Sequence, residues 1–490
     1  MTSHPSGSER AELHRLFDAQ RASFQQYAPL PHRRRIAALD AVLQLILSSQ
    51  DAIAEAIHAD FGQRHAAETR LLEIFPLVDE IRHIRRHLLR WMRPRKAPVN
   101  WQFLPSRASV HYQPLGVVGV VGAWNYPLLL ALSPLVEALA AGNHVMLKPS
   151  EKAPRCAHWI QQALASIFPP DYVTVVEGGS ALSAIFVSLP FDHLLFTGSA
   201  RVGRLVMKAA AENLTPVTLE LGGKSPALVH EEYPIAKAAD RICAAKFWNA
   251  GQTCVAPDYA LVHQRQAESF VRACEQSVLR SFPQPCSNPH YTHISSAAAW
   301  RRMAELVEDA RARGAEIRTF GAEAAPAFGS GPWPPTLILA ANDSMRVMQE
   351  EIFGPLLPVL VYSSMAQALE RIRNLPRPLA LYYFDRDSRR ARQILQSTWS
   401  GGVTVNDCIF HLPQHALPFG GIGPSGMGSY HGFDGFAAFS KKKGVLRQSR
   451  WSGFLMDRFF KPPYSPAGIT LLDHLIGKAR KKPASRFRLH

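Results

Sequence analysis

Apolar residues recur at helical spacing along residues 8–92, and runs of β-branched residues are missing there. This pattern predicts that the segment forms helices. Pro31 is placed to open the second of them, because the N–H that proline lacks would have no partner in a first helical turn. From Arg93 to Gln113 the helical spacing stops, and prolines alternate with apolar and aromatic residues. Such a composition is typical of an extended arm or hairpin.

Beyond this arm, short apolar runs alternate with longer stretches of helical spacing. Strands of this length between such helices favour parallel sheets covered on both faces. The first strands are predicted at residues 116–121, 144–147, 172–177 and 193–196, with helices that include residues 127–141 and 153–167. The alternation restarts after Gly222. The later strands are predicted at residues 227–230, 259–263, 356–361, 379–383 and 403–405, with helices at residues 235–248 and 266–281.

A chain of 490 residues is too long for one ordinary hydrophobic core. The pattern therefore predicts an α/β protein with two Rossmann-like, doubly wound parallel-sheet domains and a small β arm. The predicted boundaries are residues 1–93 and 115–222 for the first domain, 223–426 for the second, 94–114 and 427–450 for the arm, and 451–490 for a basic tail.

The composition indicates a globular protein, with 47% hydrophobic and 19% charged residues. Its six cysteines are scattered without a C-x-x-C pair, which argues against a disulfide framework or a metal site and for a reducing, cytoplasmic compartment. Residues 1–10 are polar and do not resemble a signal peptide. The longest apolar stretch, residues 115–132, is interrupted by Asn125 and Pro127, so strand, turn and helix describe it better than a membrane span.

The net charge of +16 raises the question of a nucleic-acid partner. The excess lies in basic runs that no recognised nucleic-acid module accompanies, so solvated helix faces and a basic tail are the preferred interpretation. No nucleic-acid partner is therefore predicted. Near the C-terminus, the apolar patch at residues 469–476 is too short to span a bilayer. Peripheral membrane contact through residues 469–480 stays open.

Two segments suggest covalent catalysis followed by hydrolysis. Cys254 lies in G-Q-T-C-V-A-P, and Glu220 lies in L-E-L-G-G-K. A thiol among small neighbours is accessible to a substrate, and a carboxylate beside two glycines has room to activate a water molecule. Taken alone, a single cysteine is more often a small buried hydrophobe, and paired glycines mark a turn. The functional interpretation needs further elements.

Two motifs at predicted strand ends suit a dinucleotide. In F-T-G-S-A-R-V-G, Gly198, Ser199 and Gly203 open a helix after a strand, where backbone N–H groups would face a phosphate. In K-P-S-E, Lys148 and Glu151 would hold the two sides of a ribose. A carboxylate there would repel a 2′-phosphate, which favours NAD over NADP and leaves NADP possible. Each motif alone is equally compatible with an ordinary strand end.

Two further motifs have side chains that would contact the developing oxyanion and the cofactor. Asn125 in W-N-Y-P would point its amide at a developing oxyanion. Glu351 in E-E-I-F-G-P would bind a second ribose, while Phe353 packs on a flat ring. Taken singly, these segments also describe a turn asparagine and solvated carboxylates at a helix end.

In combination, the motifs resemble the aldehyde dehydrogenase superfamily over residues 61–440. The resemblance rests on W-N-Y-P, K-P-S-E, F-T-G-S-x-x-V-G, L-E-L-G-G-K-S-P, G-Q-T-C, E-E-I-F-G-P and P-F-G-G-I-G-P-S-G-M-G. The segment after the thiol, A-P-D-Y, is similar to the class 3 branch. Within that branch D-F-G-Q-R, E-I-F-P and L-L-F are most similar to bacterial coniferyl aldehyde dehydrogenases.

The resemblance implies a role for each residue. Cys254 would be the nucleophile, Glu220 the base for water, and Asn125 with the Cys254 backbone N–H the oxyanion hole. Asn406 matches an asparagine near the family's active site. The NAD-binding residues would be Lys148, Glu151, Gly198, Ser199, Gly203, Glu351 and Phe353. The aldehyde would become a cysteine thiohemiacetal, then a thioester, then a carboxylic acid. An ordinary thiol pKa near 8.5 would leave some thiolate at neutral pH.

The substrate is less constrained by the sequence. Aromatic residues flank the catalytic segments and would line an aromatic pocket: Tyr126, Trp248, His411 and Phe419, with Phe410 and His415 beside them. They favour an aryl aldehyde such as coniferaldehyde and leave a medium- or long-chain aliphatic aldehyde open. Glu220 disfavours acyl transfer to coenzyme A, and the intact catalytic residues argue against an idle binding protein. The resemblance also implies a homodimer formed through residues 99–112 and strands around Ser440.

Overall fold

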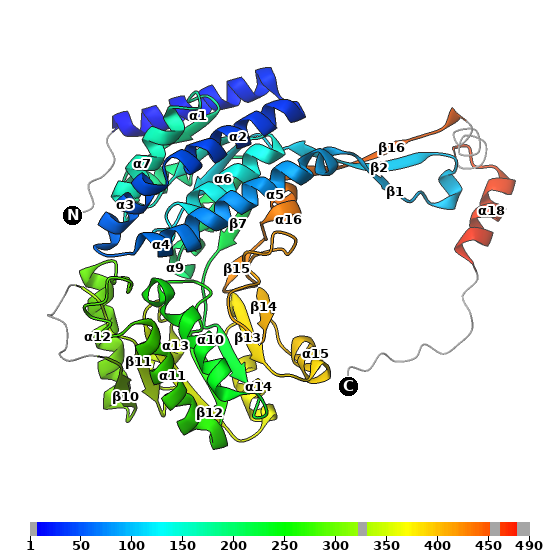
Figure 1. Cartoon of the computed structure of the whole chain (residues 1–490). Helices are drawn as coiled ribbons and strands as arrows, with labels where there is room; N and C mark the ends of the chain where they lie inside the picture. The colour runs from blue at the N-terminus through cyan, green and yellow to red at the C-terminus, as the bar shows by residue number, and fades with distance from the viewer. Residues whose placement is uncertain (1–6, 322–330, 451–460, 478–490) are drawn as a thin grey trace. The chain divides into compact units, whose positions relative to one another are not determined.

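The computed structural model describes residues 7–321, 331–450 and 461–477 (Figure 1). The chain divides into two compact units. The main unit comprises residues 1–91 and 113–441, and the arm unit comprises residues 92–112 and 442–490. The tail prediction falls partly on residues 451–460 and 478–490, which lie outside the described residues.

Residues 7–92 are helical, as the spacing of apolar positions predicts. The helices are α1 Gly7–Tyr27, α2 His32–Ser48, α3 Gln50–Phe61, α4 Ala66–Thr69, a π-helical turn η1 Arg70–Ile74, and α5 Phe75–Met92. The buried residues of α5 recur every three or four positions, and they include Leu77, Ile81, Ile84 and Leu88. Leu13 and Phe17 of α1 pack in one hydrophobic cluster with Val117 of the first sheet.

The first sheet has six strands in the order β15-β7-β6-β3-β4-β5. Its parallel strands are β3 Val117–Val121, β4 His144–Lys148, β5 Val173–Val175, β6 His193–Thr197 and β7 Val217–Glu220. The helices around it are α6 Leu129–Ala141, α7 Pro154–Ala165, α8 Ser180–Phe186 and α9 Ala200–Ala211. Strands β3, β4 and β6 are buried along their whole length, which explains their unbroken apolar runs.

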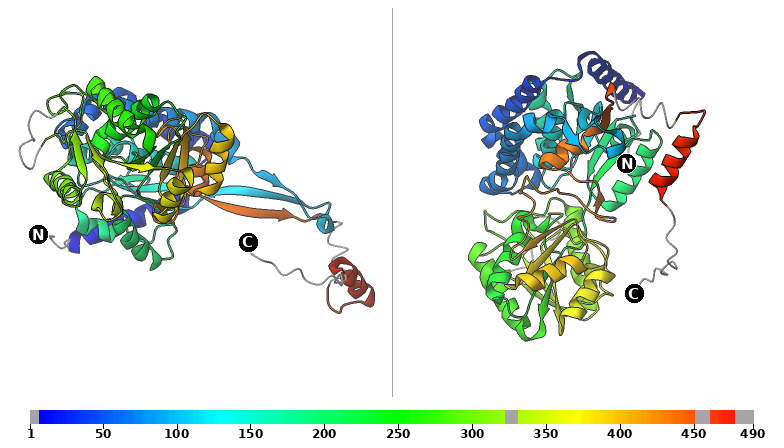
Figure 2. Two further views of the ribbon diagram at one scale, coloured as in Figure 1. Left: turned by 90° about the horizontal axis from the view of Figure 1, so that it is seen from below. Right: turned by 90° about the vertical axis from the view of Figure 1, so that its right-hand side faces the viewer.

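The second sheet has seven strands in the order β10-β11-β12-β9-β8-β13-β14. The strands are β8 Pro226–Val229, β9 Tyr259–His263, β10 Glu316–Thr319, β11 Thr336–Leu339, β12 Leu356–Tyr362, β13 Ala380–Phe384 and β14 Gly402–Val405. The helices around it are α10 Ile235–Phe247, α11 Ala267–Ser281, α12 Ala297–Ala312, α13 Arg346–Gln349, α14 Met365–Asn374 and α15 Ser388–Ser397. The two sheets form separate lobes of the main unit (Figures 1 and 2).

The structure confirms the two mostly parallel sheets and corrects details at their edges. Strand β10 pairs antiparallel with β11, and the short strand β15 Gly426–Met427 pairs antiparallel with β7. The strands β7, β10 and β11 were not predicted; β10 is mostly exposed and therefore has no apolar run to indicate it. Through β15 the chain returns from the second sheet to the first, and Gly426 lies opposite Glu220. The exact domain boundaries stay a prediction.

The arm contains a small antiparallel sheet, as expected. Its order is β1-β2-β16, formed by Arg95–Ala97, Arg107–Pro114 and Ser440–Arg447. Its role in oligomerisation stays a prediction. The apolar patch near the C-terminus lies on helix α18 Pro466–Ile476, whose first turn is capped by Ser465 Oγ accepting from Gly468 N at 3.1 Å.

No single helix among the described residues is long and apolar enough to cross a membrane. Only α2 and α3 taken together reach that length and composition, and they are bent by 71° relative to each other.

Candidate active site

Cys254 follows a turn whose backbone is strained. After α10 ends at Phe247, Asn249 and Ala250 have φ values of 51° and 50°, in the left-handed region that non-glycine residues avoid. Gly251 also has a positive φ, 72°, and a Cβ there would collide with the carbonyl oxygen of Gly354. This turn therefore needs support from the rest of the protein.

Side chains from distant segments provide that support. The Asn249 backbone N–H donates to Glu68 Oε1 at 2.7 Å, and its side-chain Nδ2 donates to the Asn125 carbonyl at 2.9 Å. Gln252 Nε2 donates to the His293 carbonyl at 3.0 Å. These bonds satisfy buried polar groups that would otherwise be costly, and they fix the path of the chain just before the thiol.

Asn125 lies beside the cysteine segment, as predicted. It follows β3, is 3% exposed, and its Nδ2 donates to the Gln252 carbonyl at 3.0 Å. A side-chain amide nitrogen has two hydrogens, so this bond leaves one for an oxyanion. Asn125 and Cys254 are therefore brought together from different sheets.

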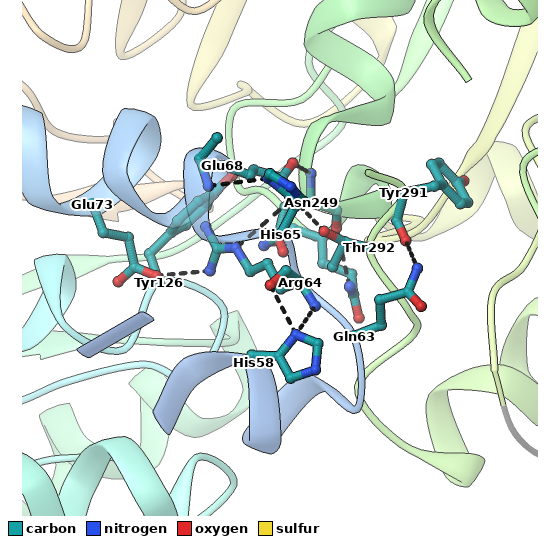
Figure 3. A network of polar contacts seen from close by, with 12 residues as sticks. His58, Gln63, Arg64, His65, Glu68, Glu73, Tyr126, Asn249, Tyr291 and Thr292 are labelled. Atoms are coloured by element: carbon teal, nitrogen blue, oxygen red, sulfur yellow. Dashed lines mark hydrogen bonds and ion pairs between the residues drawn. The ribbon is translucent and has the colours of Figure 1, made fainter. Parts of the chain in front are cut away.

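A buried arginine connects these parts (Figure 3). Arg64, which has no exposed surface, forms an ion pair with Glu73 Oε1 at 2.7 Å, and its Nη1 lies 3.4 Å from the Asn125 carbonyl. Its guanidinium lies 5.0 Å from the centre of the Tyr126 ring. The other Glu73 oxygen accepts from the Leu128 backbone N–H at 2.9 Å, just before α6 begins.

The sequence motifs did not predict a role for this network of Arg64 and Glu73. Arg64 was quoted only as part of the resemblance motif D-F-G-Q-R, and Glu73 only in E-I-F-P. No spacing rule connects them to Asn125, because their contacts to it are tertiary. The only available signal was that two oppositely charged residues stand nine positions apart within a helical region.

Glu220 ends β7 and is 3% exposed. No donor from the described residues reaches either of its carboxyl oxygens. Burial raises the pKa of Glu220 well above its ordinary value and so shifts the carboxyl group toward its protonated form. It must lose that proton before it can act as a base.

Burial also affects the pKa of the Cys254 thiol. Burial, together with the nearby carboxyl groups of Glu351 and Glu220, raises the pKa of Cys254 to about 12, against the opposing effect of backbone N–H groups at Cys254 and Val255. The thiolate fraction at neutral pH is therefore much smaller than an ordinary thiol pKa near 8.5 would give. The sequence did not reveal these surroundings of the half-buried sulfur.

The predicted NAD residues lie at the carboxyl ends of strands in the first sheet. Lys148 ends β4, and its Nζ donates to the Gly178 carbonyl at 2.6 Å and lies 3.8 Å from Glu151 Oε2. Ser199 caps α9, where its Oγ accepts from the Val202 N–H at 3.4 Å.

The glycines of this region allow close approaches. The Gly198 N–H donates to the Glu220 backbone carbonyl at 2.9 Å, which connects the loop before α9 to the residue predicted as the base. A Cβ at Gly203 would lie 2.8 Å from the Leu221 side chain, so glycine lets α9 pack closely on the segment after β7.

Glu351 and Phe353 lie near both sheets. The Glu351 carboxyl lies against Gly222, where any Cβ would collide with it. Its Oε1 is buried and has no hydrogen-bond partner in the described part of the chain. Burial raises the pKa of Glu351 to about 8. The Phe353 ring lies 5.6 Å from the ring of Trp124, which directly precedes Asn125.

A pocket with an empty volume of about 770 Å³ lies in front of Cys254. Tyr126, Trp248 and Phe419 line it, as the sequence suggests, and so does His415. The Tyr126 hydroxyl and Thr253 Oγ1 are 2.6 Å apart, so the tyrosine is fixed beside the nucleophile. The pocket residues that the sequence did not indicate include Leu72, Glu80, Leu130, Ile409, Tyr430 and His431.

Two of the suggested residues, His411 and Phe410, are not among the residues that line this pocket. The His411 Nδ1 lies 2.8 Å from Thr404 Oγ1, and its ring centre is 6.3 Å from that of Phe419. Phe410 is 44% exposed. Asn406 accepts a hydrogen bond from the Asp385 N–H at 2.9 Å and so supports the turn after β13. Its place near the active site stays a prediction.

The model of the aldehyde dehydrogenase family matches residues 2–445. This chain belongs to the aldehyde dehydrogenase family. It is 48% identical to a probable coniferyl aldehyde dehydrogenase of Pseudomonas aeruginosa, over 94% of this chain and 95% of that protein. It is 41% identical to a coniferyl aldehyde dehydrogenase of a Pseudomonas species, over 91% and 92% of the two chains.

Solved structures agree with the fold of this aldehyde dehydrogenase. The substrate-bound AldH of Staphylococcus aureus has a TM-score of 0.87 and 33% identity, covering 95% of this chain and 99% of that one. An NAD⁺ complex of an aldehyde dehydrogenase from Bacillus cereus has a TM-score of 0.81 and 25% identity, covering 90% and 89%.

Alkylation should report the raised pKa of Cys254. In the free enzyme, the rate of iodoacetamide addition to Cys254 should keep rising from pH 7 to pH 10, because the thiol pKa is about 12 and the thiolate fraction grows throughout that range. Mass spectrometry of the Cys254 peptide measures the rate, and the denatured protein is the control. A plateau below pH 9 would contradict the burial argument.

Single and double variants of the Arg64–Glu73 pair should show how much stability is lost because a buried charge is left without a partner. Arg64→Met leaves Glu73 buried and unpaired, so the free energy of unfolding should fall by about 3–5 kcal/mol. The double variant Arg64→Met, Glu73→Gln should lose less, because no unpaired charge remains. Urea denaturation measures both. Equal losses would show that the ion pair does not govern the stability of this region.

Proposed function

We propose that this aldehyde dehydrogenase oxidises hydroxylated aryl aldehydes such as coniferaldehyde to their carboxylic acids, with NAD as the hydride acceptor. The observation that carries the proposal is a pocket in which Cys254 shares its walls with Tyr126, Trp248, Phe419 and Tyr430. Flat aromatic walls suit a planar conjugated substrate. The printed names of the two Pseudomonas relatives support the same substrate.

The first step is attack of the Cys254 thiolate on the aldehyde carbon. A bond forms between sulfur and carbon, and the carbonyl oxygen becomes an oxyanion. The Asn125 amide and the Cys254 backbone N–H would donate to this oxyanion, and a preorganised donor of this kind is worth about 3 kcal/mol. Because burial opposes a free thiolate, the thiol proton must pass to water in the pocket as the substrate engages.

Several residues fit a dinucleotide. The buried Glu351 Oε1 has no hydrogen-bond partner in the described part of the chain and would accept from a ribose hydroxyl. Ser199 and the first turn of α9 would face a phosphate, and Lys148 with Glu151 would hold the other ribose. Bound NAD would supply the acceptor for the hydride that leaves the substrate carbon, so that Cys254 carries a thioester.

Glu220 completes the turnover. Its carboxylate would take a proton from water, whose oxygen attacks the thioester carbon and releases the acid and the free thiol. The raised pKa of Glu220 means that the base form grows as pH rises through that pKa. Hydrolysis should therefore accelerate from neutral to alkaline pH.

An alkyl aldehyde is the second candidate substrate. Much of the pocket wall is aliphatic and includes Leu72, Leu129, Leu130, Ile409 and Leu412. Such a wall buries methylene groups as readily as a ring.

Glu220→Gln should let the acyl-enzyme accumulate. Without the base, the first turnover would release reduced cofactor as a burst, and later turnovers would slow about 100-fold or more. Intact-mass spectrometry should show the acyl adduct on this variant. Cys254→Ser is the control, with neither burst nor adduct. Multiple turnover at the wild-type rate would remove Glu220 from the mechanism.

A substrate panel should decide between the two candidates. Coniferaldehyde, benzaldehyde and decanal are assayed with NAD and with NADP by the absorbance of the reduced cofactor. We expect the highest kcat/KM with coniferaldehyde and NAD, because aromatic side chains flank the thiol and Glu151 disfavours a 2′-phosphate. A higher kcat/KM for decanal would favour the alkyl candidate, and acyl-CoA formation on adding coenzyme A would exclude hydrolysis as the sole fate.

A further inference from the structure

Two buried carboxyl groups lie beside the substrate pocket and have no part in the chemistry above. Glu80 belongs to α5 and Glu137 to α6, and they are 2% and 0% exposed. Glu80 is one of the residues that line the pocket in front of Cys254, whereas Glu137 is not. Glutamates are rarely buried without a partner, so this pair calls for a physical explanation.

The two carboxyl groups hold a proton between them. Burial raises the pKa of both, and the negative charge of Glu80 raises that of Glu137 further. The hydrogen bond between them lowers the pKa of Glu80 and raises that of Glu137, so the proton belongs to Glu137 and Glu80 accepts it. Two ionised carboxylates could only accept hydrogen bonds, and repulsion would force them apart.

The surroundings of Glu137 hold it in place. A Cβ at Gly435 would collide with its carboxyl group, so glycine at that position leaves the room it occupies. The backbone N–H groups of His431 and Gly432 lower its pKa, which places them close to the same carboxyl. Glu137 is therefore fixed from one side and presents its proton to Glu80 on the other.

Glu80 keeps acceptor capacity beyond its two neighbours. The Glu137 proton and the Ser133 hydroxyl are its hydrogen-bond donors, whereas an ionised carboxylate has about four acceptor sites. No N–H donor from the described part of the chain reaches its buried Oε1. The neighbouring pocket wall offers mainly aliphatic groups, among them Leu72, Pro76 and Leu412. An unpaired acceptor in such a wall is unfavourable unless the ligand brings a donor, and an apolar ligand with one hydroxyl would provide it.

Among the described residues that line this pocket, Glu80 has the one carboxyl group. His431 also lines the pocket, and burial lowers its pKa to about 3, so it is neutral at pH 7. His415 Nε2 is already 2.9 Å from Asp79 Oδ2. Burial raises the pKa of Tyr430, and Glu220, Glu137, Glu80 and Cys254 raise it further, so this pocket residue lies within reach of both the reacting groups and the pair.

We infer that Glu80, held by Glu137, accepts a hydrogen bond from the ring hydroxyl of the aryl aldehyde whose carbonyl carbon lies at Cys254. Glu80 is thus a specificity-determining residue that distinguishes hydroxylated aryl aldehydes from their deoxy analogues. This inference rests on the proposed function and narrows its substrate class.

The test compares 4-hydroxycinnamaldehyde with cinnamaldehyde, which differ only in the ring hydroxyl. The wild-type enzyme should show a kcat/KM at least about tenfold higher for the hydroxylated substrate, as expected when a buried acceptor would otherwise stay unpaired. Glu80→Leu should lose that preference by lowering kcat/KM for 4-hydroxycinnamaldehyde alone. Glu80→Gln keeps an acceptor oxygen and should retain most of the preference.

Glu137→Gln is the matched control. It is equally buried and keeps a donor to Glu80, but its side chain does not line the pocket. The preference should stay within about threefold of wild type. Thermal unfolding of each variant separates a loss of fold from a loss of recognition.

Two results would overturn the inference. One is a wild-type enzyme that oxidises both aldehydes equally well, which needs no variant to fold. The other is a Glu80→Leu variant that slows both substrates by the same factor, because a structural role alone would do so. In both cases aryl aldehyde oxidation itself would stand. An enzyme that oxidises only alkyl aldehydes would instead refute the proposed function and the inference with it.

Discussion

The buried ion pair of Arg64 and Glu73 is the interaction on which the active site depends. Arg64 reaches the Asn125 carbonyl and the Tyr126 ring, while Glu73 holds the backbone where α6 begins. Glu68, one turn away, supports the strained residue Asn249 ahead of the thiol. Removing either buried charge would leave the other uncompensated, so this pair couples the N-terminal helices to the positions of Asn125 and Cys254.

Burial gives the catalytic groups a common character. It raises the pKa values of Cys254, Glu220 and Glu351 alike, because a low-dielectric interior penalises each charged form. The resting site is therefore mostly uncharged. In the proposed mechanism, charge appears only as the reaction proceeds, and fixed N–H donors from Asn125 and the backbone would stabilise it without first having to displace water.

Recognition and chemistry use different parts of one pocket. In the proposed mechanism, Cys254 and Asn125 act on the aldehyde group, which every substrate of the enzyme shares. The aromatic and aliphatic walls suit an apolar body, and we propose that polar groups such as Glu80 distinguish one body from another. In a pocket of this kind, substitution of the wall residues changes which substrate is preferred, while the nucleophile and the base stay the same.

The sequence by itself determined the helices before residue 92, the main buried strands and the motifs that carry Cys254, Glu220 and Asn125, because apolar periodicity and short motifs are local properties. It missed β7, β10 and β11, of which β10 is mostly exposed and has no apolar run, and the antiparallel edges, which depend on where the chain returns. Only tertiary structure decided that Arg64 supports Asn125, that Glu80 lines the pocket and His411 does not, and that carboxyl groups lie close to the half-buried thiol. Contacts between distant segments and the degree of burial arise only when those segments pack together, so no local pattern records them.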